Sequence, residues 1–235
     1  MRTVIIGLGG IGTYLAEPIC RISSSSKSPR ASRRILMVDG DKYEERNRER
    51  QIFREQANKA QETCVRLKDF FPNLEIEFKP TYITAENAFL FIKENDSVFL
   101  GVDNHATRKI VSDRVATLDN ALLISGGNEV RDGNAQVYRR EGGKDITPPL
   151  TFAHPEIEFP TDKHPNDLHC GELVEAGVTQ VLAANLAAAS VMVSIYTIWL
   201  QEGKTPHHEI YFDILTGNSR SATLPAVFST SVKGE

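Results

Sequence analysis

The chain opens with MRTVIIGLGGIGTYLAEPIC (residues 1–20), and the glycine-rich stretch inside this segment decides the fold. The apolar run at residues 4–6 predicts a buried parallel strand, and residues 11–22 predict a helix. The glycines between them are Gly7, Gly9, Gly10 and Gly12. They fit G-x-G-x-x-G, a turn that brings backbone amides close to a phosphate-bearing ligand at a helix N-terminus. NAD, S-adenosylmethionine and ATP can all occupy such a turn, so the glycines alone leave three nucleotide chemistries open.

The composition is that of an ordinary globular chain, which at 235 residues we expect to form one domain. The net charge of -4 argues against a nucleic-acid-binding surface. The cysteines Cys20, Cys64 and Cys170 include no C-x-x-C pair, which argues against a disulfide framework and against a structural zinc site. Because no signal peptide precedes the first strand, we expect a cytoplasmic protein.

One uncharged stretch, residues 178–200, is long enough to cross a bilayer. It contains polar residues, however, and no Lys/Arg cluster flanks it. We therefore interpret it as a helix buried in the core or in a subunit contact, without a membrane. Its apolar surface exceeds what one small sheet covers, which predicts a homodimer.

Strands and helices alternate through the first half of the chain. After a serine-rich loop at residues 23–34, strands are predicted at 35–38, 74–78, 97–102 and 121–125, and helices at 58–71, 84–95 and 104–119. This alternation predicts an α/β fold with a Rossmann-like, doubly wound and mostly parallel sheet.

The second half changes character. Residues 133–141 predict a strand, and residues 142–169 hold five prolines and little periodicity, which is typical of a long functional loop. Residues 207–215 and 219–225 predict a closing antiparallel hairpin. We expect a single domain over residues 1–235, with a nucleotide-binding part at 1–125. The remainder, 126–235, would supply the crossover loop, the long helix and the closing strands.

The stretch VDGDKYEERNRERQIF (residues 38–53) narrows the choice of nucleotide. Asp39 ends the second strand, where an acidic residue usually binds ribose hydroxyls. An NAD enzyme would need little more than this. Here Asn47, Arg50 and Gln51 follow, and Lys59 opens the next helix. Folded over the glycine turn, this set would surround a triphosphate with donors and positive charge, which favours ATP.

These motifs resemble the ThiF/MoeB/HesA family, the ubiquitin-activating-enzyme-like adenylyltransferases. That family carries G-x-G-G-x-G, then D-x-D and N-x-x-R-Q, a lysine opening the next helix, and D-N after a later strand. The matching residues, within 1 to about 125, are Gly7, Gly9, Gly10, Gly12, Asp39, Asp41, Asn47, Arg50, Gln51, Lys59, Asp103 and Asn104.

The resemblance implies ATP-dependent adenylation of a carboxylate, with the C-terminal glycine of a small ubiquitin-like or sulfur-carrier protein as substrate. By resemblance, Asp39 would bind the ribose and Asp103 would hold Mg²⁺. Asn47, Arg50, Gln51 and Lys59 would bind the phosphates. Adenylation brings two anions together, and cations, helix amides and a carboxylate-held Mg²⁺ would offset their repulsion.

The chain also departs from the family pattern. The segment between the R-Q pair and Lys59 is short and has no glycine, and no helical arm with its arginine precedes the first strand. Arg108 is a candidate to replace that cation. The alternatives are a nucleotide-binding pseudoenzyme acting as a scaffold, an NAD-dependent oxidoreductase and a methyltransferase.

Cys170, in NDLHCGELVEAG, is the predicted nucleophile for a thioester. A cysteine near a helix N-terminus, with His169 beside it, would have a lowered pKa. The competing interpretations are a small buried hydrophobe and a metal site with His164 and His169. Cys20 and Cys64 fall on the apolar faces of predicted helices.

Overall fold

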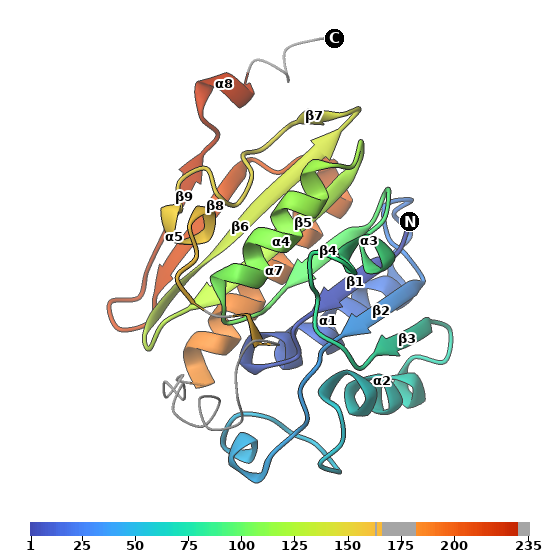
Figure 1. Ribbon diagram of the computed structural model, residues 1–235. Coiled ribbons are helices and arrows are strands. Elements are labelled where there is room, and N and C mark those ends of the chain that lie inside the picture. The colour runs from blue at the N-terminus through green and yellow to red at the C-terminus, as the bar shows by residue number, and fades with distance from the viewer. Residues whose placement is uncertain (163, 166–181, 230–235) are drawn as a thin grey trace.

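A single mixed sheet, covered by helices on both faces, forms the centre of the protein in a computed structural model (Figure 1). The structure describes residues 1–162, 164–165 and 182–229. The strands are β1 (Thr3–Ile6), β2 (Arg34–Val38), β3 (Glu75–Lys79), β4 (Ser97–Leu100), β5 (Ala121–Asn128), β6 (Asp132–Glu141), β7 (Lys144–Asp145), β8 (His207–Asp213) and β9 (Asn218–Thr223).

The strand order is β3-β2-β1-β4-β5-β6-β8-β9, and β7 pairs with β6. Neighbours from β3 through β5 are parallel, whereas β5 to β9 are joined by antiparallel ladders. The predicted α/β fold with a parallel core and a C-terminal antiparallel hairpin is confirmed. The predicted division at residue 125 falls inside β5, so one continuous sheet joins the two parts.

The helices are α1 (Gly10–Ser25), the 3₁₀ helix η1 (Glu45–Glu49), α2 (Lys59–Phe70), α3 (Ala88–Phe91), α4 (His105–Ala116), α5 (Pro155–Glu158), α7 (Leu182–Glu202) and α8 (Ala226–Ser229). Helices α1, α2, α4 and α7 lie close to the predicted ranges, whereas η1, α5 and α8 were not predicted. The helix expected at 84–95 is reduced to the single turn of α3. The long loop expected at 142–169 contains β7 and α5 in its described part.

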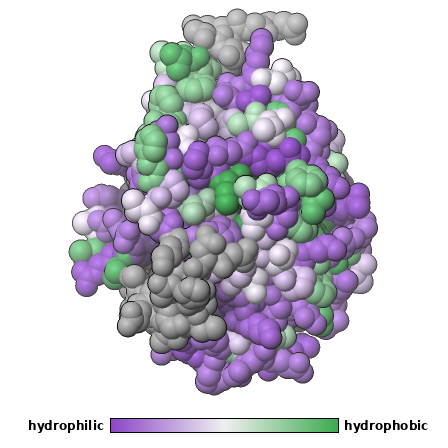
Figure 2. Space-filling model, in the orientation of Figure 1, coloured by the Kyte–Doolittle hydropathy of each residue, from purple (hydrophilic) through white to green (hydrophobic). Residues whose placement is uncertain are grey.

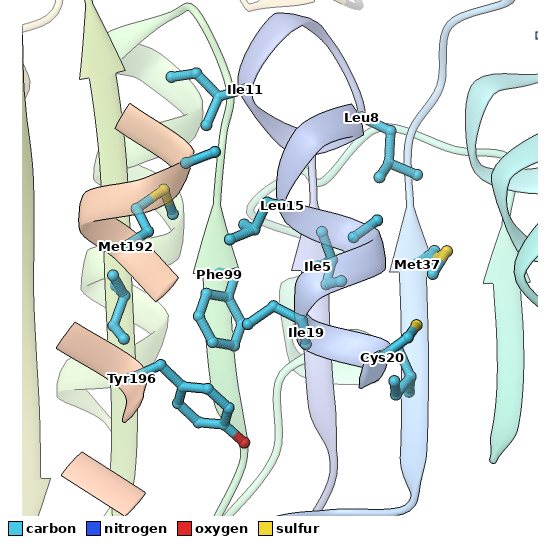
Figure 3. Close-up of a cluster of buried hydrophobic side chains, with 14 of the residues drawn as sticks. Ile5, Leu8, Ile11, Leu15, Ile19, Cys20, Met37, Phe99, Met192 and Tyr196 are labelled. Atoms are coloured by element: carbon cyan, nitrogen blue, oxygen red, sulfur yellow. The ribbon is translucent and has the colours of Figure 1, made fainter. Parts of the chain in front are cut away.

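Alternating side chains along the strands create two hydrophobic layers, because successive residues of a strand point to opposite faces. Ile5 and Phe99 face α1 and α7, where they pack with Leu15 and Met192 (Figure 3). Their neighbours in sequence pack with α3, α4 and α5 on the other face. Both faces of the central strands are therefore buried, which explains their continuous apolar runs.

Helix α7 covers the sheet beside α1. Among the described helices it alone is long and apolar enough to cross a membrane, by length and composition. Its inner side, including Ala188 and Tyr196, is completely buried on the sheet. Its outer side exposes Leu186 (44%) and Ile198 (39%).

The opposite face of the molecule, with α4 and α5, is mostly hydrophilic (Figure 2). Hydrophobic residues there gather in small groups, one of them over α8, where Val227 is 73% exposed. The outer side of α7, with its exposed Leu186 and Ile198, is thus more hydrophobic than this face.

The chain leaves β1 for α1 on one face of the sheet, and leaves the adjacent β4 for α4 on the other face (Figure 1). Such a topological switch point opens a crevice outside the carboxyl ends of the strands, where doubly wound folds bind ligands. The glycine turn, Asp39 and Asp103 all directly follow strands that end at this edge.

Candidate functional site

The glycine turn brings the start of α1 against the end of β1 without an intervening side chain. Gly7 has φ of 81°, a conformation that favours glycine. A Cβ atom added to Gly12 would lie 1.9 Å from the carbonyl oxygen of Gly7. The turn therefore depends on the absence of side chains at these two positions.

No described side chain occupies the space directly beside Gly9 at the N-terminus of α1. Gly9 is the N-cap residue, and it provides no side-chain cap to the first amides of the helix. A Cβ atom added to Gly9 would meet no atom of the described residues within 4 Å. Uncapped amides and the positive end of the helix dipole make this space suitable for an anion such as phosphate.

Asp39 is buried and already holds two backbone amides. Its Oδ2 accepts a hydrogen bond from the amide of Leu8 (2.5 Å), and its Oδ1 accepts one from the amide of Asp41 (2.7 Å). Burial raises the pKa of Asp39 to about 6, although Lys59 and these hydrogen bonds act in the opposite direction. Asp39 thus shapes the glycine turn, and a ribose hydroxyl would share its oxygens with these amides.

Lys59 provides a largely buried positive charge at the site. Its Nζ lies 2.8 Å from Oδ2 of Asp41, and the Tyr82 hydroxyl donates to the other Asp41 oxygen. Burial opposes protonation of Lys59, but Asp39 and Asp41 outweigh it and raise its pKa. Burial alone would raise the pKa of Asp41, but Lys59 and Tyr82 lower it overall. An ionised pair is therefore preformed beside the glycine turn.

Sequence reasoning missed Tyr82, which lies beyond the end of β3. Its ring packs on Gly40, where an added Cβ would lie 2.5 Å from the ring. Tyr82 belongs to no motif. The sequence feature that could have identified it is its position shortly after a strand of the parallel part of the sheet.

Asn47 and Gln51 are buried and build the loop. The Asn47 side chain accepts from the amide of Glu44 (2.8 Å) in a capping box at η1. The Gln51 amide donates to the carbonyl of Leu8 (3.0 Å) and to the hydroxyl of Thr13 (2.8 Å). Phosphate binding by these two residues stays a prediction: both bonds of the Gln51 amide nitrogen go to the protein in this conformation, whereas the Asn47 bond uses only its acceptor oxygen.

Arg50 and Asp103 differ from these residues. Neither side chain forms a hydrogen bond or an ion pair with any residue that the structure describes. The Arg50 carbonyl accepts from the Tyr14 hydroxyl (2.5 Å), which fixes the loop to α1 while the guanidinium remains half-buried. Asp103 is exposed directly before α4. Among the residues that the structure describes around the site, Arg50 and Asp103 are therefore available to a ligand.

Arg108, considered as a replacement cation, is instead structural. Its guanidinium donates to Ser125 Oγ (2.8 Å) and to the carbonyls of Val102 (2.7 Å) and Gly126 (2.8 Å). Burial lowers its pKa to about 10, so it remains charged at neutral pH. Arg108 braces the ends of β4 and β5 and has little capacity left for a ligand.

Cys170 and His169 lie outside the described residues. Cys20 and Cys64 are completely buried, as predicted, and burial raises the pKa of Cys20 to about 12. His164 contacts the carbonyl of Ile83 through Nε2 (2.6 Å). In the part of the chain that the structure describes, no three His, Cys, Asp or Glu residues are grouped so that they could hold a metal ion.

Comparison with known proteins gives one family and several relatives. The sequence model of the ThiF family matches residues 1–230. The chain is 25% identical over 215 residues to the adenylyltransferase and sulfurtransferase MOCS3 of Anopheles gambiae, covering 89% of this chain and 44% of that protein. It is 24% identical over 237 residues to the sulfur carrier protein adenylyltransferase of Thermus thermophilus, covering 94% and 78%. The chain thus spans less than half of the MOCS3 protein.

Solved structures share the fold. E. coli MccB with MccA-N7isoASN superposes with a TM-score of 0.72 at 16% identity, covering 95% of this chain and 64% of that one. E. coli MccB with ATP gives a TM-score of 0.68 at 16% identity, covering 95% and 63%.

Two glycine substitutions should separate folding from ligand binding. Gly9→Ala places its methyl group in open space, so we expect a melting temperature close to that of the wild type and weaker binding of ATP. Gly12→Ala drives a methyl group into the Gly7 carbonyl, so we expect marked destabilisation. Thermal melts with and without ATP check both. Equal melts for the two variants would contradict this account of the turn.

Asp39 predicts a pH dependence of stability. Its pKa in the folded protein, about 6, exceeds the ordinary value of 3.8. Its contribution to the free energy of unfolding is therefore complete below pH 3.8 and is lost as the pH rises through about 6. The full difference corresponds to about 3 kcal/mol. We expect the stability of the wild type relative to Asp39→Asn to fall between pH 4 and 7, measured by urea unfolding. If the unfolding free energies of the two proteins changed in parallel with pH, the raised pKa of Asp39 would be disproved.

Proposed function

This chain belongs to the ThiF family, and from that premise we propose that it catalyses ATP-dependent adenylation of a carboxylate. One observation carries the proposal: an uncapped helix N-terminus lies at a switch point beside Asp103, and the loop that carries Arg50 is tied to the same helix through Tyr14, while neither charged side chain pairs with a described residue. The buried ammonium of Lys59 adds a second positive charge. This arrangement suits a polyphosphate with a metal ion better than a dinucleotide.

The reaction is a substitution at phosphorus. A carboxylate oxygen of the acyl substrate attacks the α-phosphorus of ATP, the bond to the bridging oxygen breaks, and pyrophosphate leaves. Both reactants are anions, so their approach is repulsive. Arg50, Lys59 and the first amides of α1 supply positive potential that is already in place before the substrates bind.

Lys59 would act by exchanging partners. In the free protein its ammonium pairs with Asp41, which Tyr82 also contacts. A phosphate oxygen would replace that carboxylate as the partner of the ammonium. The buried charge is thus never left unpaired, which would be costly.

Mg²⁺ fits the residues present. Asp103 is an exposed carboxylate that bonds to no side chain in the described part of the chain, and Mg²⁺ is usually held by one or two carboxylates together with phosphate oxygens and waters. Asp103 would hold the ion, which would neutralise negative charge on the departing pyrophosphate.

The acyl substrate is, in this proposal, the C-terminal glycine of a small sulfur-carrier or ubiquitin-like protein. The name of the Thermus thermophilus relative supports this choice. A thioester could follow if the Cys170 thiolate attacked the carbonyl of the acyl adenylate and released AMP. The reaction would take place in the cytoplasm, in a homodimer that buries the uncharged outer side of α7.

One observation favours a second candidate, a nucleotide-binding scaffold. The Gln51 amide nitrogen and the Arg108 guanidinium both donate within the protein, so fewer donors are available for phosphate than the predicted site contained. ATP–pyrophosphate exchange with a candidate carrier protein decides between the two. Exchange supports the enzyme, and tight ATP binding without exchange with any carrier supports the scaffold. Tight NAD binding without ATP binding would refute both.

Substitution of the two unpaired side chains should affect exchange strongly. We expect Arg50→Ala and Asp103→Ala each to lower the exchange rate about 10²–10³-fold, because each removes a preorganised electrostatic contact. Both should keep the melting temperature of the wild type, since neither side chain is bonded to the described fold.

Matched controls are Arg54→Ala and Asp113→Ala. Arg54 is exposed, and its guanidinium forms only a long ion pair of 4.0 Å with the Asp69 carboxylate. Asp113 is exposed and forms an ion pair with Lys109 on the surface of α4. We expect near-normal exchange from both controls. Near-normal exchange in the Arg50 and Asp103 variants would place the reaction elsewhere.

A further inference from the structure

Asn185 is a buried polar residue without a hydrogen-bond partner among the residues that the structure describes. It lies in the first turn of the described part of α7 and is completely inaccessible to solvent. Neither its Nδ2 nor its Oδ1 forms a hydrogen bond within the described part of the chain. Leaving a buried amide unsatisfied costs free energy, and an apolar side chain of similar size would avoid that cost. An unsatisfied group in a well-packed core points to a role beyond packing.

The side chain of Asn185 lies against the glycine turn. A Cβ atom added to Gly10 would be 2.6 Å from Nδ2 and 2.8 Å from Oδ1 of Asn185. Gly10 is the first residue of α1, directly after the uncapped Gly9. Figure 3 shows the two helices side by side on the sheet, with Ile11 between the start of α1 and α7. The unused amide therefore lies beside the unused amides of the helix N-terminus.

We propose that Asn185 is a phosphate-binding residue, whose Nδ2 donates a hydrogen bond to the phosphate chain of ATP at the N-terminus of α1. The inference rests on the proposed nucleotide-dependent function. A neutral amide suits this position, because a fully buried cation would carry a much larger desolvation penalty in the free protein. The bound phosphate accepts from Nδ2, so the part of the cost that this donor carries in the free protein is recovered on binding.

A purely structural role makes a different prediction. If Asn185 only filled the space beside Gly10, an apolar side chain of similar volume would serve as well for nucleotide binding. The decisive variant is therefore Asn185→Leu, which removes both polar atoms. Asn185→Asp keeps the shape and adds a negative charge, and it provides a second variant if leucine does not fit.

The experiment measures binding of ATP in the presence of Mg²⁺ by calorimetry, and the melting temperature of each free protein. For Asn185→Leu we expect a higher melting temperature together with about 10- to 100-fold weaker ATP binding, the range typical for losing a hydrogen bond to a charged group. Asn185→Asp should bind ATP more weakly still, through repulsion.

Tyr196→Phe is the matched control. Tyr196 is buried on the same helix, about 16 Å further along its axis, where it packs on Phe99. The Tyr196→Phe variant should bind ATP as tightly as the wild type does. If the wild type binds ATP and both folded Asn185 variants bind it equally well, the inference is wrong. If the wild type binds no ATP, the proposed function itself fails.

Discussion

The peptide group of Leu8 is the point on which the site depends. Its amide donates to Asp39, and its carbonyl accepts from Gln51 and Thr13. These bonds join the turn after β1 to the segment after β2 and to the loop that follows it. They are possible only because the start of α1 approaches β1 without side chains between them. Loss of this close approach would release the loop that carries Arg50.

The site combines a rigid frame with a few unused groups. Most polar residues around the turn have partners, and the dense bonding holds the backbone of the loop in place. Arg50, Asp103 and the first amides of α1 remain available, and Lys59 is paired with a carboxylate that a phosphate could replace. Such preorganised charge is effective because little reorganisation is needed when the reactants bind.

Helix α7 contributes to both stability and the site. Along most of its length it covers the sheet with small and apolar side chains, which the uncharged sequence indicates. In the first turn of its described part, Asn185 departs from this pattern where α7 contacts Gly10 of the glycine turn. The described part of the crossover segment reaches the other helix of the switch point, where Asp162 accepts from the amides of His105 (2.5 Å) and Ala106 (3.2 Å).

The sequence alone determined every described strand except the two-residue β7, the longer helices, the glycine turn and the set of polar residues at the strand ends. These features are local, since apolar runs, glycine spacing and a residue's position after a strand are read from neighbouring residues. Only the tertiary structure decided which polar side chains have partners. Gln51 bonds to Leu8, Arg108 to the end of β5, and Tyr82 to Asp41, and each pair is separated by many residues. Asn185 likewise meets Gly10 from the far end of the chain. Such contacts arise from how the elements pack, because burial determines the partner of each polar group, and residue spacing does not contain that information.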